Sequence, residues 1–236
     1  MRERAGFLRP IACGVVLAGA LWISGCRTPD PELQARIEAR AAGAPGAGAV
    51  YRGSAPFARK PLAVGQWTEH LGSVPKSVKT LLRQEVIAAG EGGFWIRQVL
   101  TTPYEENELR FFVVPSEDGS SGVWEFRRIQ IFRKDGGVRE LRARKDVPAF
   151  LVPYAVSGGG PESAAQGAAG EPIAVPAGCF EGCVLVEADG ARQWLHDAVP
   201  ITGIVREAAA DGEERWELAA FGWGAAAKPA RKARAR

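Results

Sequence analysis

A mainly β fold, built around one curved antiparallel sheet, is predicted by three features of the sequence. From Leu62 onward, apolar runs rich in Val, Ile, Phe and Trp alternate with turn signals such as GEGG, KDGG and ADG, which is typical of meandering antiparallel strands. No long helical period competes with these runs. Two of the runs also change the phase of their apolar alternation, which indicates β-bulges and a curved sheet. The runs expected as strands are residues 65–71, 77–88, 94–102, 108–114, 122–133, 178–187, 191–197, 201–208 and 215–224.

The N-terminal segment predicts export. It begins with Arg2, Arg4 and Arg9 and continues into the apolar stretch Ile11–Trp22. This stretch of roughly a dozen residues is shorter than the about 20 that a bilayer-spanning helix needs. A basic start, a short apolar stretch and small residues at the cut site are typical of a secretory signal. We therefore expect residues 1–25 to be a lipoprotein signal peptide.

The end of this segment resembles the bacterial lipobox. Ile23-Ser24-Gly25-Cys26 is a branched apolar residue, two small residues and a cysteine, and in that family the Cys thiol receives diacylglycerol and the chain is cut before it. The resemblance implies that Cys26 is acylated and begins the mature chain, with enough acyl chains for stable anchoring. A plain signal peptide with an incidental Cys and an uncleaved anchor are the alternatives. Arg27 stands where inner-membrane lipoproteins of this class often have Asp, which implies the periplasmic face of the outer membrane.

Residues 26–61 are expected to be the acylated cysteine and a flexible tether. Within them, Leu33, Ile37 and Ala41 fall at four-residue spacing, so a short helix could form here. The rest of the segment mixes Gly, Pro and Ala without periodicity. If flexible, the tether would span roughly 30 Å and hold the domain off the membrane.

Two expected strands need a bulge to keep their apolar side chains on one face. On a regular strand, Trp124 and Phe126 would lie opposite Ile129 and Ile131, so we expect a bulge near Arg127–Arg128.

The same argument applies to the last expected strand. Trp216 and Leu218 would lie opposite Phe221 and Trp223, which predicts a bulge near Ala219–Ala220. A large sheet curved by two bulges has a concave apolar side that something must cover.

The segment 146–172 is the largest interruption of the expected sheet. Its first part is apolar and broken by prolines, and its second part is rich in Gly, Ala and Ser. Loops this long tend to be functional or disordered, so a lid over the sheet and a solvated insertion are both open. The basic tail, residues 225–236, is expected to be disordered from its composition, or to be attracted to anionic lipid headgroups or lipopolysaccharide.

Four short sequences, taken in order, carry a family resemblance. They are VGQWTEH, VPAGCFEGCVLV, VPITGIV and ELAAFGWG. Together they resemble exported bacterial proteins with the LolA/LolB-like fold, a curved antiparallel half-barrel lined with apolar residues and closed by a helical or loop lid. The resemblance covers residues 62–224 and implies one half-barrel domain with a loop or short-helix lid. Many members of this group have no assigned activity, so it implies no functional residues.

Charge argues against nucleic acid as a partner. The formal net charge of the chain is +3, and the basic tail concentrates positive charge outside the expected domain, whose body is mildly acidic. A nucleic-acid-binding protein needs basic residues on its folded surface.

Few residues suggest catalysis, so we expect no enzyme activity and no cofactor. His70 and His196 are the only histidines, whereas a zinc site needs three or four ligands. Asp197 follows His196, but neighbouring strand residues point to opposite faces, so we expect His196 to be an exposed histidine at a strand end. No nucleophile elbow, dinucleotide fingerprint or phosphate loop is present.

Cys179 and Cys183 could form a disulfide in an oxidising compartment. Four residues of straight strand span about 13 Å, whereas bridged Cα atoms lie within roughly 7 Å. A bridge therefore needs a bend, which Gly178 and Gly182 could permit, and both states stay open.

The leading hypothesis is a non-enzymatic outer-membrane lipoprotein that binds an apolar ligand, such as an acyl chain or another lipoprotein's lipid, in the half-barrel. The alternative is an envelope scaffold or assembly subunit with a filled core, a protein partner and no ligand. Ligand pockets are mostly apolar and aromatic. The candidate groove residues are Trp95, Phe111, Trp124, Phe126 and Trp216.

Overall fold

The computed structural model describes residues 28–43, 48–53, 57, 60–73, 78–115, 124–132, 136–141, 171–188, 191–209 and 212–224. Within these residues the fold is mainly β, with one helix and thirteen strands. The elements are α1 (Pro31–Ala41), β1 (Val50–Arg52), β2 (Gln66–Ser73), β3 (Lys79–Gly90), β4 (Gly93–Thr101), β5 (Glu106–Pro115), β6 (Trp124–Phe132), β7 (Val138–Leu141), β8 (Ile173–Val175), β9 (Gly178–Glu181), β10 (Val184–Ala188), β11 (Ala191–Leu195), β12 (Ile204–Ala209) and β13 (Glu214–Trp223).

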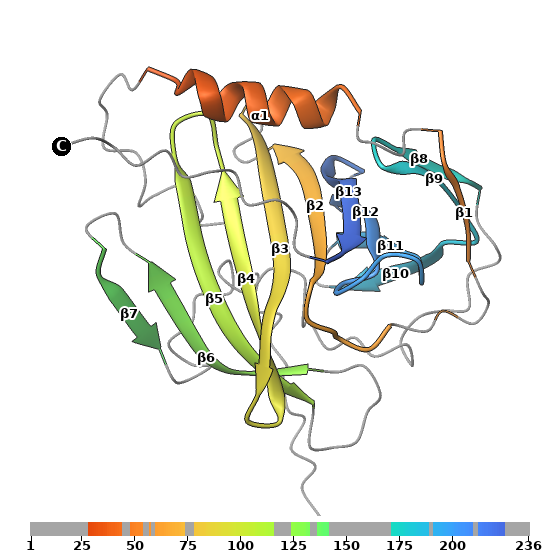
Figure 1. Cartoon of the computed structure of the whole chain (residues 1–236). Coiled ribbons are helices and arrows are strands. Elements are labelled where there is room, and N and C mark those ends of the chain that lie inside the picture. The colour runs from red at the N-terminus through yellow and green to blue at the C-terminus, as the bar shows by residue number, and fades with distance from the viewer. Residues whose placement is uncertain are drawn as a thin grey trace, which may run out of the picture.

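Ten strands form one antiparallel sheet in the order β10-β11-β12-β13-β2-β3-β4-β5-β6-β7, and this sheet is not closed. Three strands form a second sheet in the order β1-β9-β8, in which β1 runs parallel to β9. Figure 1 shows the large sheet bending between β7 and β10, with the small sheet beside β10–β13. The expected mainly β fold with a large antiparallel sheet is confirmed.

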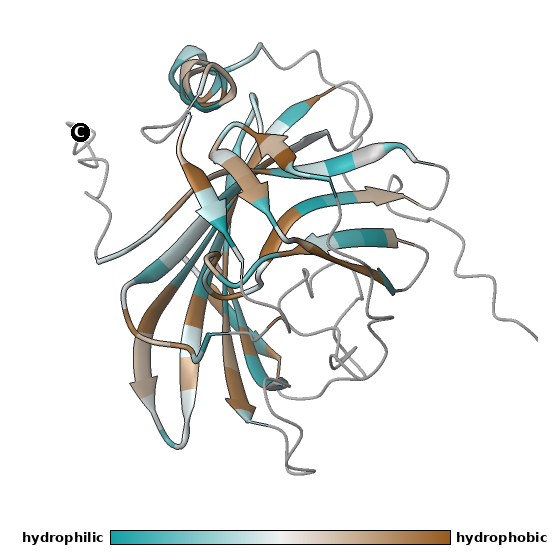
Figure 2. Ribbon diagram, turned by 90° about the vertical axis from the view of Figure 1, so that its right-hand side faces the viewer, coloured by the Kyte–Doolittle hydropathy of each residue, from teal (hydrophilic) through white to brown (hydrophobic). Residues whose placement is uncertain are grey.

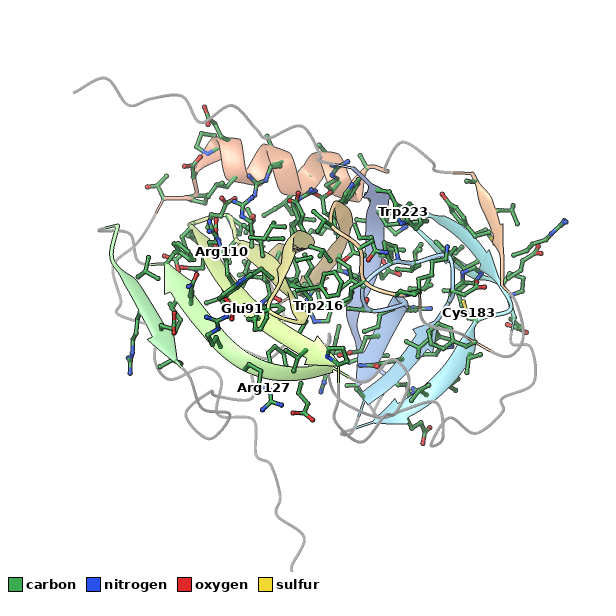
Figure 3. The ribbon with its side chains drawn as sticks, turned by 60° about the horizontal axis from the view of Figure 1, so that its bottom comes forward. Glu91, Arg110, Arg127, Cys183, Trp216 and Trp223 are labelled. Atoms are coloured by element: carbon green, nitrogen blue, oxygen red, sulfur yellow. The ribbon has the colours of Figure 1, made fainter. Side chains whose placement is uncertain are left out.

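Both expected bulges are present. Between β5 and β6, Phe112 pairs with Arg128 and Val113 pairs with Phe126, so Arg127 is the extra residue. Arg127 is exposed, and its side chain extends away from the body of the protein (Figure 3). The bulge brings Phe126 to the same side of the sheet as Ile129.

The bulge in β13 lies at Ala219. Leu218 pairs with His70 and Ala220 pairs with Glu69, so the alternation shifts by one residue. As a result, Leu218 and Phe221 both contact one core cluster. Bulges increase the local twist of a strand, and these two lie in the strands where the sequence predicts them.

The two sides of the ten-stranded sheet differ in character. We call the side that carries Ile96, Phe111 and Leu218 the inner face, and the side that carries Arg83 and Arg97 the outer face. Hydrophobic and hydrophilic positions alternate along the strands (Figure 2), as they do when one face of an antiparallel sheet covers the core. One inner-face cluster comprises Leu62, Val86, Ile96, Phe111, Val113, Ile129 and Ile201. A second, where the small sheet packs on β12 and β13, comprises Ala177, Phe180, Cys183, Val199, Val205 and Leu218.

The described part of residues 26–61 is not a free tether, which corrects that expectation. The short helix does form as α1, and the Asp30 carboxylate accepts hydrogen bonds from the first-turn amides of Glu32 and Leu33, a standard N-cap. Ile37 is 2% exposed. β1 pairs with β9, which adds this segment to the small sheet. This described part is held in place because it contacts residues far along the chain, as in the stacking of Tyr51 on Phe180.

α1 lies on the outer face, across the ends of the strands (Figure 1). Arg36 bonds Thr101 and Glu106, and Arg40 pairs with Glu69. All three partners lie on the outer face, because each of them is next to an inner-face residue along its strand. The helix that the structure describes is therefore not a lid on the inner face.

The single strand expected over residues 178–187 is two strands in two different sheets. β9 ends at Glu181, and β10 begins at Val184 at the edge of the large sheet. Gly182, between them, has a φ of 80°, a left-handed conformation that glycine adopts without steric cost. The apolar pattern runs through this turn, so periodicity alone does not reveal it.

Several expectations lie outside the described residues. These are the signal peptide with Cys26, nearly all of the interruption at 146–172, and the basic tail. Among the residues that are described, no helix is long and apolar enough to cross a membrane.

Candidate functional site

The inner face brings some of the candidate groove residues together. Phe111 and Phe126 contact each other edge to face, with ring centroids 5.5 Å apart. Phe111 is fully buried, whereas Phe126 is half-buried. The backbone of Trp124 pairs with that of Pro115 near the same end of β5, and the Trp124 side chain is outside the described part. These strands place an aromatic pair on the inner face of β5 and β6.

Trp95 does not belong to this group, which corrects its assignment to the groove. It pairs with Phe112 on the outer face, and their ring centroids lie 5.3 Å apart. The Arg128 guanidinium lies over both rings, 5.2 Å and 4.8 Å from their centroids. The expectation failed because the run containing Trp95 is apolar on both faces, so its alternation does not say which side is inner.

Trp216 is on the inner face but far from Phe111. It lies on β13, four strands from β5 in the order of the sheet. Its side chain is buried in the middle of the molecule (Figure 3). The five residues proposed as one groove therefore lie on two faces of the sheet. On the inner face they are divided between two halves, one around β5 and β6 and the other around β13.

A buried polar stripe crosses the inner face between β13 and β5. Thr68, Gln84 and Gln98 lie side by side on β2, β3 and β4, and all three are buried. The Gln84 amide donates to the Gln98 side-chain oxygen at 3.1 Å. Thr68 Oγ1 has no hydrogen-bond partner among the described residues. The sequence signal for this stripe is a polar residue at an inner-face position of each of the three strands.

A small cavity lies beside the stripe. The space open to the centre of a water molecule is about 10 Å³, which is room for about one water. An acyl chain does not fit into this cavity as it stands. Its walls are formed by His70, Leu82, Gln84, Thr202, Ile204, Glu207 and Trp216.

His70 has a structural role beside this cavity. Its Nε2–H donates to the Ile204 carbonyl at 2.9 Å, because a carbonyl oxygen can only accept. Burial lowers the pKa of His70 from 6.5 to about 4. The ring is therefore neutral near pH 7 and links β2 to β12 across β13.

His196 is buried, which corrects its expected exposure. It follows the end of β11, at a turn, and is 1% exposed. Its Nδ1 accepts from the Ala198 amide at 3.0 Å, and its Nε2–H donates to the Glu181 carbonyl at 3.2 Å. Burial lowers the pKa of His196, so its ring is neutral near pH 7. The Asp197 carboxylate, 3.4 Å from Nδ1, therefore lies beside a neutral ring.

Cys179 and Cys183 are free thiols in the structure. The expected bend is present at Gly182, yet the two cysteines lie on either side of it without a bridge. The Cys183 thiol is buried and directed at the Phe180 carbonyl, 3.8 Å away. Burial, followed by the charge of Cys179, raises the pKa of Cys183 to about 12, which makes it a poor nucleophile.

The described residues contain no group of three or more His, Cys, Asp or Glu side chains that could hold a metal ion. Comparison with protein-family models, with curated proteins and with solved structures gives no match to this chain.

Proposed function

We propose that the protein is a non-enzymatic lipoprotein, anchored through Cys26 in the outer membrane, that binds an apolar chain on the inner face of β4–β7. We infer that this open, bulged sheet is a LolA/LolB-like half-barrel. The observation that carries the proposal is that several inner-face side chains of these strands are only half-buried although they contact the core. They are Phe94, Phe126, Ile131 and Leu141.

The chemistry of this surface suits a hydrocarbon chain. The register places Ile96, Phe111, Ile129 and Leu141 in one row across β4 to β7. The row is continuous, and it crosses the strands as an extended chain could. Ile96, Phe111 and Ile129 in this row are already buried, so a bound chain would gain affinity by covering the half-buried side chains beside them, such as Phe126 and Ile131. Removing apolar area from water contributes about 25 cal/mol per Å².

A second candidate is a scaffold subunit with a filled core and no ligand. The cavity beside Trp216 holds about one water molecule, and Phe111 and Ile129 are already buried. These observations favour a protein partner at the outside of the domain rather than a lipid within it.

A binding experiment distinguishes the two candidates. The full chain, solubilised in mild detergent, is titrated with a dansyl-labelled fatty acid, and we expect saturable fluorescence enhancement. Phe126→Asp places a charge on the inner face, and should weaken this binding by about tenfold, since 1.4 kcal/mol is a factor of ten in affinity.

Phe132→Asp is the matched control. Phe132 is also half-buried on β6, but it lies on the outer face. The Arg110 guanidinium lies over the Phe132 ring, 4.3 Å from the ring centroid. Binding by this variant should change less than about twofold, with both variants checked for unchanged circular dichroism. Absence of saturable binding to the wild-type chain, together with a stable protein partner in a pulldown, would favour the scaffold.

A further inference from the structure

The chain is fixed to the sheet almost immediately after the proposed lipid anchor. Thr28, the first described residue, is two residues after Cys26, so their Cα atoms lie within about 7 Å of each other. Two residues later, the Asp30 amide donates to the Pro103 carbonyl at 2.7 Å. Pro103 lies in the turn between β4 and β5. The anchor therefore has little free chain with which to leave this end of the sheet.

The helix that follows is held to the outer face by side chains along its length. Arg36 bonds Thr101 and Glu106 at the end of the β4–β5 hairpin. Arg40 pairs with the buried Glu69 at 2.7 Å. Glu69 also pairs with Arg83 at 2.7 Å, so Arg40 is one of its two charge partners. Releasing α1 would remove one of the two charge partners from this buried carboxylate, which is unfavourable.

The surface beside the anchor carries a residue suited to a membrane interface. Tyr104, in the β4–β5 turn, is 43% exposed and follows the Pro103 that holds Asp30. Tyrosine is enriched at headgroup level because its ring is apolar and its hydroxyl is polar. Glu32 and Glu38 are exposed on α1, which favours zwitterionic over anionic phospholipid here.

We propose that the end of the sheet formed by α1 and the β4–β5 turn lies against the phospholipid bilayer that holds the Cys26 anchor. This orientation rests on the proposed acylation of Cys26. It replaces the expected 30 Å tether with direct apposition of the domain and the membrane.

The orientation also places the other end of the sheet far from the lipid. β4 has nine residues, which extend about 30 Å, and the β3–β4 turn is at the opposite end of the strands from α1 (Figure 1). Ala89, exposed on β3 near that turn, should therefore be out of reach of the bilayer, while Tyr104 touches it.

Photo-crosslinking tests this difference on the intact protein. The full chain is purified from bacterial membranes into nanodiscs of zwitterionic phospholipid, with p-benzoylphenylalanine in place of Tyr104 or, as the matched control, of Ala89. After illumination, mass spectrometry counts phospholipid adducts. We expect at least about fivefold more adduct at position 104, because position 89 is more than 20 Å farther along the strands. Equal adducts at both positions, or more at position 89, would overturn the orientation.

A variant that frees α1 from the sheet and a mass measurement distinguish the proposed orientation from the proposed acylation of Cys26. Arg36→Ala with Arg40→Ala, in the Tyr104 crosslinking background, should lower the adduct toward the Ala89 level while the protein stays in the disc. Unchanged adduct would show that docked α1 does not set the orientation. Intact mass without a diacylglyceryl increment on Cys26 would overturn both the anchor and the orientation, whereas lipidated protein with equal adducts would overturn the orientation alone.

Discussion

The two halves of the inner face carry the same kind of side chains but differ in what covers them. On β12 and β13, the small sheet packs over the face, and Phe180, Val205 and Leu218 are fully buried. On β4–β7, side chains such as Phe126 and Ile131 are half-buried, although they contact the core.

This difference teaches that an apolar inner face does not by itself define a ligand site. Where a second sheet covers the face, its apolar residues stabilise the fold, as in any packed pair of sheets. Where the cover is incomplete, the same residues become a surface that can bind. The functional question is therefore concentrated in β4–β7.

The largest expected effect comes from weakening the covered half. Phe180 is 0% exposed and stacks on Tyr51, with ring centroids 4.6 Å apart. Phe180→Ala should lower the free energy of unfolding by about 3–5 kcal/mol, the range for large buried side chains replaced by alanine. Urea unfolding followed by tryptophan fluorescence measures it. A loss below 1 kcal/mol would show that the small sheet is not a firm cover.

The sequence predicts the large sheet well because its signal is local. Alternation, turn residues and the phase changes at Arg127 and Ala219 all act within one strand, and the structure confirms them. The small sheet was missed because β1 and β8 have three residues each. The pairing of β1 with β9 also joins segments more than 120 residues apart, and no local pattern encodes it.

The candidate site was predicted less completely. Phe111 and Phe126 lie on the inner face, but Trp95 lies on the outer one. Alternation says which residues share a face, and not which face turns inward when both carry apolar side chains. The Gln84–Gln98 bond depends on strand register, which single strands do not determine.

The next effect tests the link between β2 and β12. The pKa of His70 is about 4 in the folded protein, whereas its ordinary value is 6.5. Between these two pH values the unfolded chain therefore binds one more proton at this residue than the folded protein does. Stability should therefore fall as pH decreases through this window, by about 2 kcal/mol between pH 7 and pH 5 from this residue. Urea unfolding at both pH values measures the change.

His70→Gln supplies the comparison for this prediction. Other groups also titrate in this range, including His196, whose pKa is lowered in the same direction. The variant should therefore lose about 2 kcal/mol less than the wild type between pH 7 and pH 5. The same loss in both proteins would mean that His70 is not buried as a neutral ring.

A smaller effect is expected in the half-covered region. Phe126→Ala should lower the free energy of unfolding by roughly 1–2 kcal/mol, less than Phe180→Ala because less apolar area leaves contact with the protein. The same urea titration checks it. If both substitutions cost the same, the two halves are equally covered, and the contrast on which the proposed site depends is wrong.

The smallest net effect is expected at the polar stripe that lies between the two halves. Gln84→Leu alone should cost about 1–3 kcal/mol, because it leaves the buried Gln98 oxygen without the donor it has at 3.1 Å. Adding Gln98→Leu removes the unpaired group as well, so the double variant should return to within about 1 kcal/mol of the wild type. A double-mutant cycle of urea midpoints measures this coupling. Additive costs would show that each glutamine is satisfied independently. A double variant that keeps its stability but loses dansyl fatty acid binding would extend the ligand site from the apolar half onto the stripe.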